Sequence, residues 1–128
     1  MTPNPPVLLS IVELGGYPNF APLYERLGCR VVVENSMRKA LNAVKRHAPR
    51  VIVAEFNFQS DFRDRTSSLE SLMAAVQRVP EARVIVFYEK EYATQLARLQ
   101  ARFAFFRVMA YPIDETALAD TVSAALAG

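Results

Sequence analysis

Short, strongly apolar segments recur along the chain and alternate with segments in which apolar residues repeat every three or four positions. An apolar run of about four to eight residues, bounded by polar residues or proline, is typical of a strand buried on both faces. A repeat of three and four is typical of a helix with one face against a core. The segments that predict strands are Val7 to Val12, Cys29 to Val33, Val51 to Ala54 and Arg83 to Tyr88, with Phe105 to Ala110 as the candidate for a fifth.

Most helical segments between these strands begin at a side chain that can accept a hydrogen bond from the first helical turn. The predicted caps are Asn19, Ser36, a capping box formed by Ser67-Ser68-Leu69-Glu70, and Asp114. The fourth helix is predicted from its apolar stripe, which consists of Tyr92, Leu96, Leu99 and Phe103. Gly28 and Pro80 are placed to end the first and third helices.

Strictly alternating strands and helices with short connections predict a parallel sheet with helices on both faces. We therefore expect an α/β doubly wound sandwich, with a five-stranded parallel sheet of order 2-1-3-4-5 and five helices. The chain has 128 residues, of which 52% are hydrophobic, and this is enough for one domain. We expect that domain to span residues 1–128, with its core from about 7 to 126.

The charge and the cysteine content narrow the classes of function. Fifteen Lys and Arg against thirteen Asp and Glu leave a net charge of +2, which is too small to predict a nucleic-acid partner for this domain. Cys29 is the only cysteine, so neither an intrachain disulfide nor a cysteine-based zinc site can form. Because no signal peptide and no membrane-spanning stretch is found, we expect a soluble, cytoplasmic protein with no membrane partner.

A carboxylate ends the most apolar of the predicted strands. The run from Val51 to Ala54 is followed directly by Glu55. The carboxyl ends of parallel strands form the edge where α/β proteins place their chemistry. Glu55 is therefore the first candidate for a functional residue.

Three segments of the chain resemble receiver domains of bacterial response regulators, which have the CheY-like, flavodoxin-like fold. Residues 49–55 resemble the family's third strand, which ends in the phosphoacceptor aspartate. Residues 83–88 resemble its fourth strand, which ends in a switch serine or threonine, and Tyr111-Pro112-Ile113-Asp114 followed by Leu118 resembles the Lys-Pro turn before the last helix. The similarity runs from Val7 to Leu126 and implies the same doubly wound fold.

The residues at the phosphotransfer positions differ from those of the family. In receivers, a pair of acidic residues and the aspartate bind magnesium, and the lysine contacts the phosphoryl group. Here the resemblance places one carboxylate, Glu13, after the first strand, with Glu55, Tyr88 and Tyr111 at the phosphoacceptor, switch and lysine positions. The carboxylate of Glu55 is displaced relative to that of an aspartate, and the lysine is missing. A magnesium ion and the charge that develops on a transferred phosphoryl group would therefore be poorly held. We therefore expect a degenerate pseudo-receiver, which is not an enzyme and has neither a metal nor another cofactor.

Two interpretations are open for each of these positions. Glu55 is either a solvated carboxylate at a strand end, which we favour, or an imitation of the charge of a phosphorylated aspartate. Tyr88 and Tyr111 either fill the space left by metal and phosphate, which we favour, or fix the aromatic switch of receivers in one state. The resemblance also implies that the Tyr111–Pro112 peptide bond is cis.

Two surfaces are candidate interfaces. The loop of residues 56–66 carries Phe58, Phe62, Arg63 and Arg65, a composition that protein interfaces favour, although the rings can equally pack inward. Arg98 and Arg102 on the fourth helix and Arg107 on the fifth strand belong to the face through which receivers dimerise or dock their targets. The resemblance implies that a protein partner or a second copy binds there, whereas the same arginines are also usual on a solvated face.

Two classes of function remain. The preferred hypothesis is a phosphorylation-independent, receiver-like signalling module that acts by protein–protein interaction in a bacterial two-component or related regulatory pathway. The alternative is a ligand-binding or catalytic flavodoxin-like domain that uses Glu13, Glu55, Tyr88 and Tyr111 at the carboxyl edge of the sheet. A divergent receiver that accepts phosphate on Asp61 or Asp64 is disfavoured, because both lie far from the strand end in the sequence.

Overall fold

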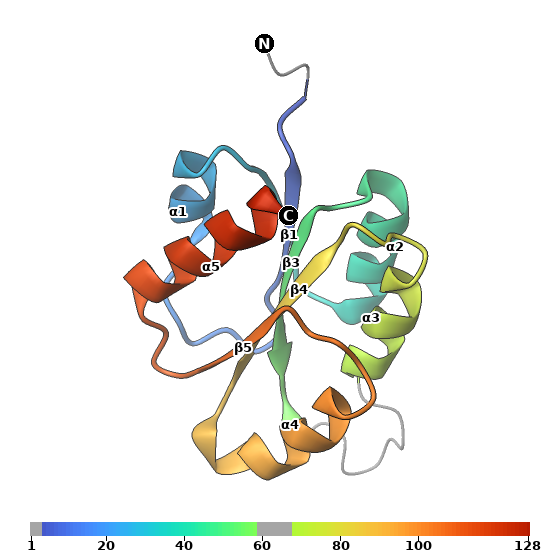
Figure 1. Cartoon of the computed structure of the whole chain (residues 1–128), viewed down its shortest axis with the longest axis vertical. Coiled ribbons are helices and arrows are strands. Elements are labelled where there is room, and N and C mark those ends of the chain that lie inside the picture. Colours follow the sequence, from blue (N-terminus) through green and yellow to red (C-terminus); the bar gives the residue numbers. More distant parts are fainter. Residues whose placement is uncertain (1–3, 59–67) are drawn as a thin grey trace.

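Strands and helices alternate along the chain in the computed structural model, which describes residues 4–58 and 68–128 (Figure 1). A short 3₁₀ helix, η2, precedes the fourth α-helix. In chain order the elements are β1 (Val7–Ile11), α1 (Ala21–Arg26), β2 (Arg30–Glu34), α2 (Met37–His47), β3 (Val51–Phe56), α3 (Ser68–Val76), β4 (Arg83–Tyr88), η2 (Lys90–Tyr92), α4 (Ala93–Gln100), β5 (Arg107–Ala110) and α5 (Glu115–Ala127).

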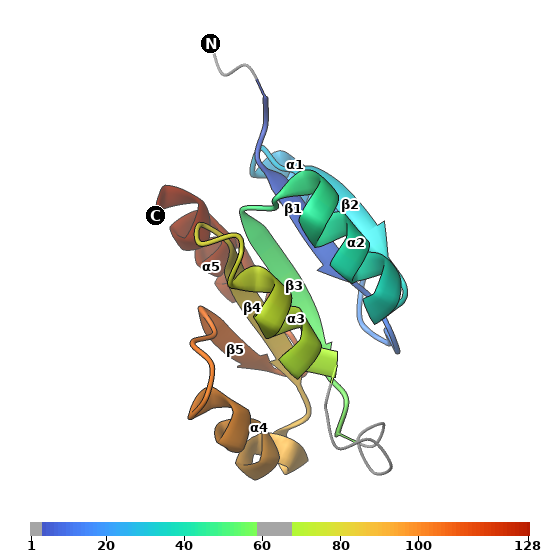
Figure 2. The same cartoon turned by 90° about the vertical axis from the view of Figure 1, so that its right-hand side faces the viewer.

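The strands form one parallel sheet in the order β2-β1-β3-β4-β5, which confirms the predicted topology. Helices α1 and α5 cover one face, and α2 and α3 lie side by side on the other (Figures 1 and 2). Leu96 and Leu99 place α4 on the same side as α2 and α3. Successive residues of each strand contribute to opposite layers of the core, as Ile52 and Val53 do on β3.

Side-chain caps fix the beginnings of two helices where the sequence predicts them. The Ser36 hydroxyl accepts a hydrogen bond from the Lys39 N–H at 3.2 Å, and the Asp114 carboxylate accepts one from the Ala117 N–H at 2.9 Å. Asn19 accepts from the Ala21 N–H, although Phe20 holds the cap position of α1. Ser67 of the predicted capping box lies outside the described residues. None of the helices that the described residues form is long and apolar enough to cross a membrane.

Strand β3 extends further than its apolar run predicts. It continues through Glu55 to Phe56, and both residues pair in register with β4. The carboxylate is therefore held inside the sheet edge and not in the following loop. In contrast, β5 begins only at Arg107, so the two phenylalanines before it lie outside the strand.

Candidate functional site

Glu55 is buried at the carboxyl edge of the sheet, with only 2% of its surface exposed. Its register partner on β4 is Phe87, so both side chains lie on the face that α1 and α5 cover. A buried carboxylate is costly unless hydrogen-bond donors surround it. The hydrogen-bond donors around Glu55 therefore determine whether its charge is stabilised in this buried position.

Five donors satisfy the Glu55 carboxylate. The backbone N–H groups of Glu13, Leu14 and Gly15 donate to it at 3.2, 2.9 and 3.3 Å. The Tyr17 hydroxyl donates at 2.6 Å, and the Asn57 side-chain amide donates at 3.1 Å. We call these donors and the carboxylate together the Glu55 clamp.

The loop after β1 supplies most of the clamp because its backbone is turned inward. Gly15 and Gly16 have φ angles of 69° and 86°, in the left-handed region that side chains disfavour. Successive N–H groups in such a turn converge on one point and form an anion-binding nest. Here the anion is the carboxylate of the chain itself.

The favoured interpretation of Glu55 as a solvated carboxylate is wrong. The negative charge of its carboxylate is stabilised by hydrogen bonds from N–H and O–H groups of the neighbouring loop, and not by a lysine. Lys90 is a cation that follows β4 in the sequence. It lies exposed in η2 and makes no hydrogen bond to Glu55. Sequence reasoning missed Tyr17 and the loop amides, and the adjacent pair of glycines after the first strand was the available signal.

An aromatic cluster packs around the clamp on the α1 and α5 side of the sheet. The ring of Tyr17 stacks on Tyr111 with centroids 5.7 Å apart and meets Phe87 edge-on at 5.2 Å. Phe20 and Tyr111 also contact Phe87, at 6.3 and 6.0 Å. The Tyr111–Pro112 bond is cis, as the resemblance implies. These rings occupy the side of the edge where the resemblance places the lysine and the switch residue.

Tyr88 does not belong to this cluster, which differs from the position expected from the sequence. It pairs in register with Phe56 and packs in the layer formed by α2, α3 and α4. Neighbouring residues of a strand face opposite sides, so an offset of one residue moves a side chain to the other layer. The residue of β4 beside Glu55 is therefore Phe87, which has no hydroxyl group.

Burial keeps the two phenols of the cluster protonated. Desolvation raises the pKa of Tyr17 far above its usual value, and its hydrogen bond to the Glu55 carboxylate raises it further. Desolvation, followed by the charges of Glu55 and Glu89, also raises the pKa of Tyr111. Tyr17 therefore remains a hydrogen-bond donor to Glu55 over the physiological pH range.

The residues of this edge do not fit a magnesium ion of the kind that receivers hold. Magnesium needs oxygen lone pairs that are free to coordinate. Both oxygens of Glu55 already accept hydrogen bonds from N–H and O–H groups. Glu13 contacts Glu55 through its backbone N–H. Within residues 4–58 and 68–128, no three His, Cys, Asp or Glu side chains come together as a metal site.

A cavity of about 310 Å³ opens beside the clamp, on the side of the loop after β3. Phe58 is 38% exposed at this cavity, and its ring contacts those of Phe56 and Tyr92. The lining residues are Leu14, Gly15, Phe56, Asn57, Phe58, Glu89, Glu91, Tyr92 and Tyr111. The other predicted loop residues, Phe62, Arg63 and Arg65, lie outside the described part of the chain, as do Asp61 and Asp64.

The three arginines of the predicted partner surface have different surroundings. Arg98 and Arg107 are exposed. Arg102 forms an ion pair with Glu70 at the start of α3, and its guanidinium lies 5.0 Å from the centre of the Phe103 ring. Arg102 therefore ties the end of α4 to α3, a structural role that the sequence does not reveal.

Comparison with solved structures defines the fold class. A response regulator receiver domain protein from Clostridium thermocellum superposes with a TM-score of 0.75 at 15% identity, over 97% of this chain and 95% of that one. A response regulator from Thermotoga maritima gives 0.71 at 14% identity, over 98% and 100%. The two component transcriptional regulator AraC from Clostridium phytofermentans gives 0.73 at 14% identity, over 95% and 93%.

The chain thus has the CheY-like fold of response regulator receiver domains. No protein-family model and no curated protein matches the sequence. The similarity to receiver domains therefore concerns the fold, and a shared fold does not by itself establish a shared function.

Proposed function

We propose that this protein is a phosphorylation-independent, receiver-like signalling module, which acts by protein–protein interaction in a two-component or related regulatory pathway and is not an enzyme. The receiver fold over nearly the whole chain supports the signalling role. The Glu55 clamp supports independence from phosphorylation.

The observation that carries the proposal is the set of donors around Glu55. A phosphorylated aspartate would present an anion at this edge, and N–H groups beside it would have to receive that charge. In this chain, the Glu55 carboxylate already supplies a buried anion to the amides of Glu13, Leu14 and Gly15. The three N–H groups of this nest are therefore occupied by a carboxylate of the chain itself, and none of them is left over to stabilise a phosphoryl group.

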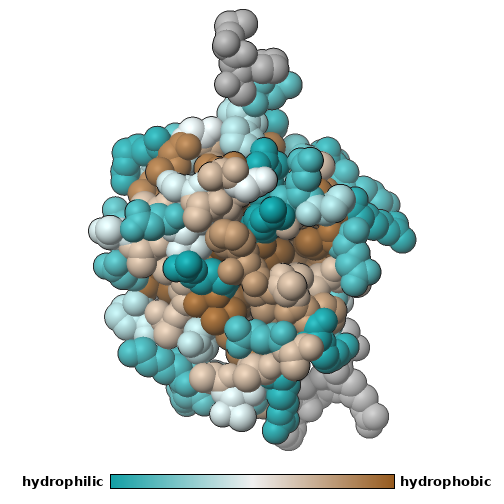
Figure 3. Space-filling view, viewed as in Figure 1, coloured by the Kyte–Doolittle hydropathy of each residue, from teal (hydrophilic) through white to brown (hydrophobic). Residues whose placement is uncertain are grey.

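The proposed output surface is the face formed by α4, β5 and α5. Strand β5 is an edge strand, and apolar side chains gather near the centre of this face of the molecule (Figure 3). Phe105, Phe106, Val108 and Met109 are only half-buried there. Apolar surface ringed by polar residues is typical of a protein interface. Arg98 on α4 and Arg107 on β5 are exposed and are the candidates for the contacts that set specificity.

Incubation with acetyl phosphate and Mg²⁺ tests the proposal. We expect no acid-labile phosphate on the protein, because a carboxylate enclosed by five donors cannot attack phosphorus. A receiver domain that retains its aspartate and its lysine serves as the positive control. Stoichiometric phosphate on the wild-type chain, located at Glu55 by peptide mass spectrometry, would contradict it.

The cavity beside the clamp supports a second candidate, a small-ligand site at the same edge. Its volume of about 310 Å³ lies at the lower end of the range for ligand pockets. Its aromatic walls and the carboxylates of Glu89 and Glu91 favour a small organic cation. A fragment screen by NMR tests this, and saturable binding of aromatic amines at Phe58 and Tyr92 would favour the ligand site over the signalling role.

A further inference from the structure

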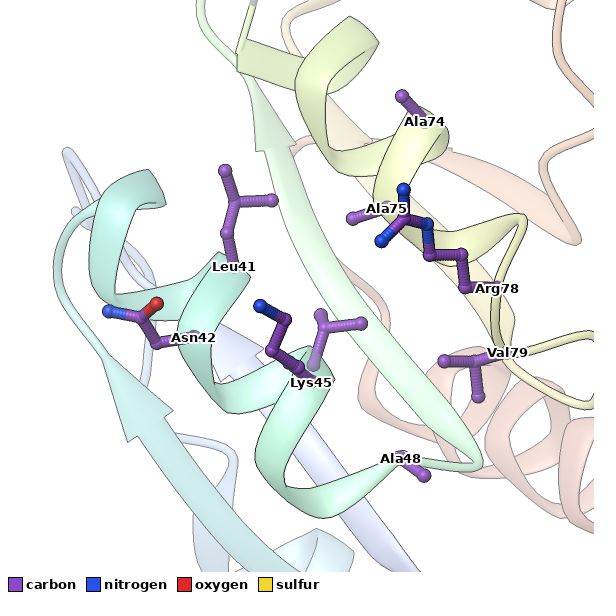
Figure 4. Close-up of a pocket in the computed structure, with 9 residues that line it drawn as sticks. Leu41, Asn42, Lys45, Ala48, Ala74, Ala75, Arg78 and Val79 are labelled. Atoms are coloured by element: carbon purple, nitrogen blue, oxygen red, sulfur yellow. The ribbon is translucent and has the colours of Figure 1, made fainter.

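A groove runs between α2 and α3, on the side of the sheet that faces away from the Glu55 clamp (Figures 2 and 4). It encloses about 540 Å³. The lining residues are Leu41, Asn42, Val44, Lys45, Ala48, Ala74, Ala75, Arg78 and Val79. None of them belongs to the clamp or to the α4, β5 and α5 face.

The floor of the groove is apolar. Leu41 on α2 faces Ala75 on α3 across the gap, and Val79 continues the wall beyond the end of α3 (Figure 4). Leu41, Ala75 and Val79 are all half-buried, so each still presents surface to solvent. The small side chains of α3 at this point leave the space open.

The rims of the groove are cationic. Lys45 on α2 and Arg78 after α3 are both exposed, and neither makes an ion pair within the part of the chain that the structure describes. Helix α2 carries further cations at Arg38, Lys39 and Arg46 and has no Asp or Glu. The net charge of the whole chain is only +2, so α2 is strongly basic for this chain, although Lys39 and Arg46 line a separate recess beside Glu34.

We propose that this groove binds an acidic amphipathic helix of a partner protein. Apolar side chains spaced at i, i+3 or i+4 and i+7 would fill the floor, as in helix-in-groove recognition. Carboxylates on both flanks of that helix would face Lys45 and Arg78. Helix α2 has 11 residues and is about 16 Å long, which matches about three turns of a bound helix.

Other occupants fit the groove less well. Small ligands bury most of their surface in their pockets, whereas this groove stays open along the exposed Asn42, Lys45 and Arg78. Nucleic acid would engage the cations but would leave the apolar floor unused. An anionic membrane would likewise contact the cations, whereas the floor is recessed between the helices.

Synthetic helical peptides test the proposal on the 128-residue chain. The probe has leucines at i, i+3, i+4 and i+7 with glutamates on both flanks, and two matched peptides carry lysines in place of the glutamates or the same residues in scrambled order. We expect the acidic peptide alone to shift the backbone amide signals of Leu41, Lys45, Ala75 and Val79 in a saturable way. Its affinity should fall as salt is raised.

Charge reversal at the rims is the decisive variant. The double substitution Lys45→Glu and Arg78→Glu should weaken binding of the acidic peptide by about tenfold or more, because attraction becomes repulsion at both flanks. The control is Arg30→Glu together with Lys90→Glu, which makes the same change in net charge at two exposed residues outside the lining of the groove and should leave the affinity unchanged. Far-UV circular dichroism checks that both variants fold.

Several results would overturn the inference. Equal binding of the acidic and basic peptides, or of the scrambled peptide, would show that the groove lacks the proposed selectivity. Unchanged affinity in the Lys45→Glu and Arg78→Glu variant would place the peptide elsewhere. If single-stranded DNA or phosphatidylglycerol vesicles displace the peptide and bind more tightly at the same residues, the partner is a nucleic acid or a membrane and not an acidic helix.

Discussion

At the scale of single residues, the hydroxyl of Tyr17 is the contact that distinguishes the Glu55 clamp from an ordinary turn. Backbone N–H groups are supplied by any sequence that adopts the loop, whereas the 2.6 Å bond from Tyr17 depends on one side chain. The ring of Tyr17 also packs against Phe87 and Tyr111. Removing only the hydroxyl therefore separates the hydrogen bond from the packing.

The variant Tyr17→Phe should lower the free energy of unfolding by about 1.5–3 kcal/mol, because a hydrogen bond to a charged, buried acceptor is lost. Urea unfolding monitored by circular dichroism measures the change. Tyr88→Phe is the matched control, since Tyr88 lies in the opposite layer and makes no contact with Glu55. Equal effects of the two substitutions would show that the Tyr17 bond contributes nothing to stability.

The raised pKa of Tyr17 predicts how stability depends on pH. In the unfolded chain the phenol ionises with a pKa of about 10, whereas in the folded chain it holds its proton to higher pH. Its contribution is therefore complete below about pH 10 and is lost progressively above it, because the unfolded state then releases a proton that the folded state retains. The urea midpoint should fall above about pH 10, and less steeply in Tyr17→Phe. Identical slopes for both proteins would contradict this.

At the scale of elements, the sequence predicted the order of strands and helices and both ends of β4, but it ended β3 and began β5 two residues too early. The apolar runs are buried on both faces, so they mark the strands clearly and carry no alternation that assigns a residue to a face. The resemblance assigned Tyr88 to the switch position of this edge, whereas the register puts Phe87 beside Glu55. The end of β3 was missed because a carboxylate normally marks a loop, and its compensating donors lie about forty positions away in sequence.

The N-cap hydrogen bond of α2 leads to a prediction about stability. Ser36→Ala removes the acceptor for the Lys39 N–H and should destabilise the protein by about 1 kcal/mol, as N-cap losses usually do. Ser123→Ala, on the exposed side of α5, is the matched control and should change stability little or increase it slightly, because alanine has the higher helix propensity. Thermal unfolding compares them. A loss in Ser123→Ala as large as in Ser36→Ala would contradict the role of the cap.

At the scale of the whole molecule, the fold brings together parts that are distant in sequence. Glu55 was identifiable from the sequence because a carboxylate ends a buried strand. The amides of residues 13–15 carry no side-chain signature, so their part in the clamp emerges only when β1 and β3 lie side by side. The pairing of Arg102 with Glu70 and the groove between α2 and α3 likewise depend on packing between helices.

We expect the clamp and the groove between α2 and α3 to act separately. The clamp faces the α1 and α5 layer, whereas the groove lies between α2 and α3 on the other side of the sheet. Distant sites without shared contacts have additive effects. Lys45→Glu with Arg78→Glu should therefore leave the urea midpoint shift of Tyr17→Phe unchanged when the substitutions are combined. A clear departure from additivity would show that the two regions are coupled.

We propose that Glu55 takes the place of a phosphoryl group, and a titration with Mg²⁺ and beryllofluoride tests this proposal. Beryllofluoride imitates the acyl phosphate of a receiver domain. Amide NMR spectra report on the N–H groups of Glu13, Leu14 and Gly15, which donate to the Glu55 carboxylate. We expect that these signals do not shift in a saturable way. Saturable shifts at these amides and at Tyr111 would show a working phosphoryl site and would contradict it.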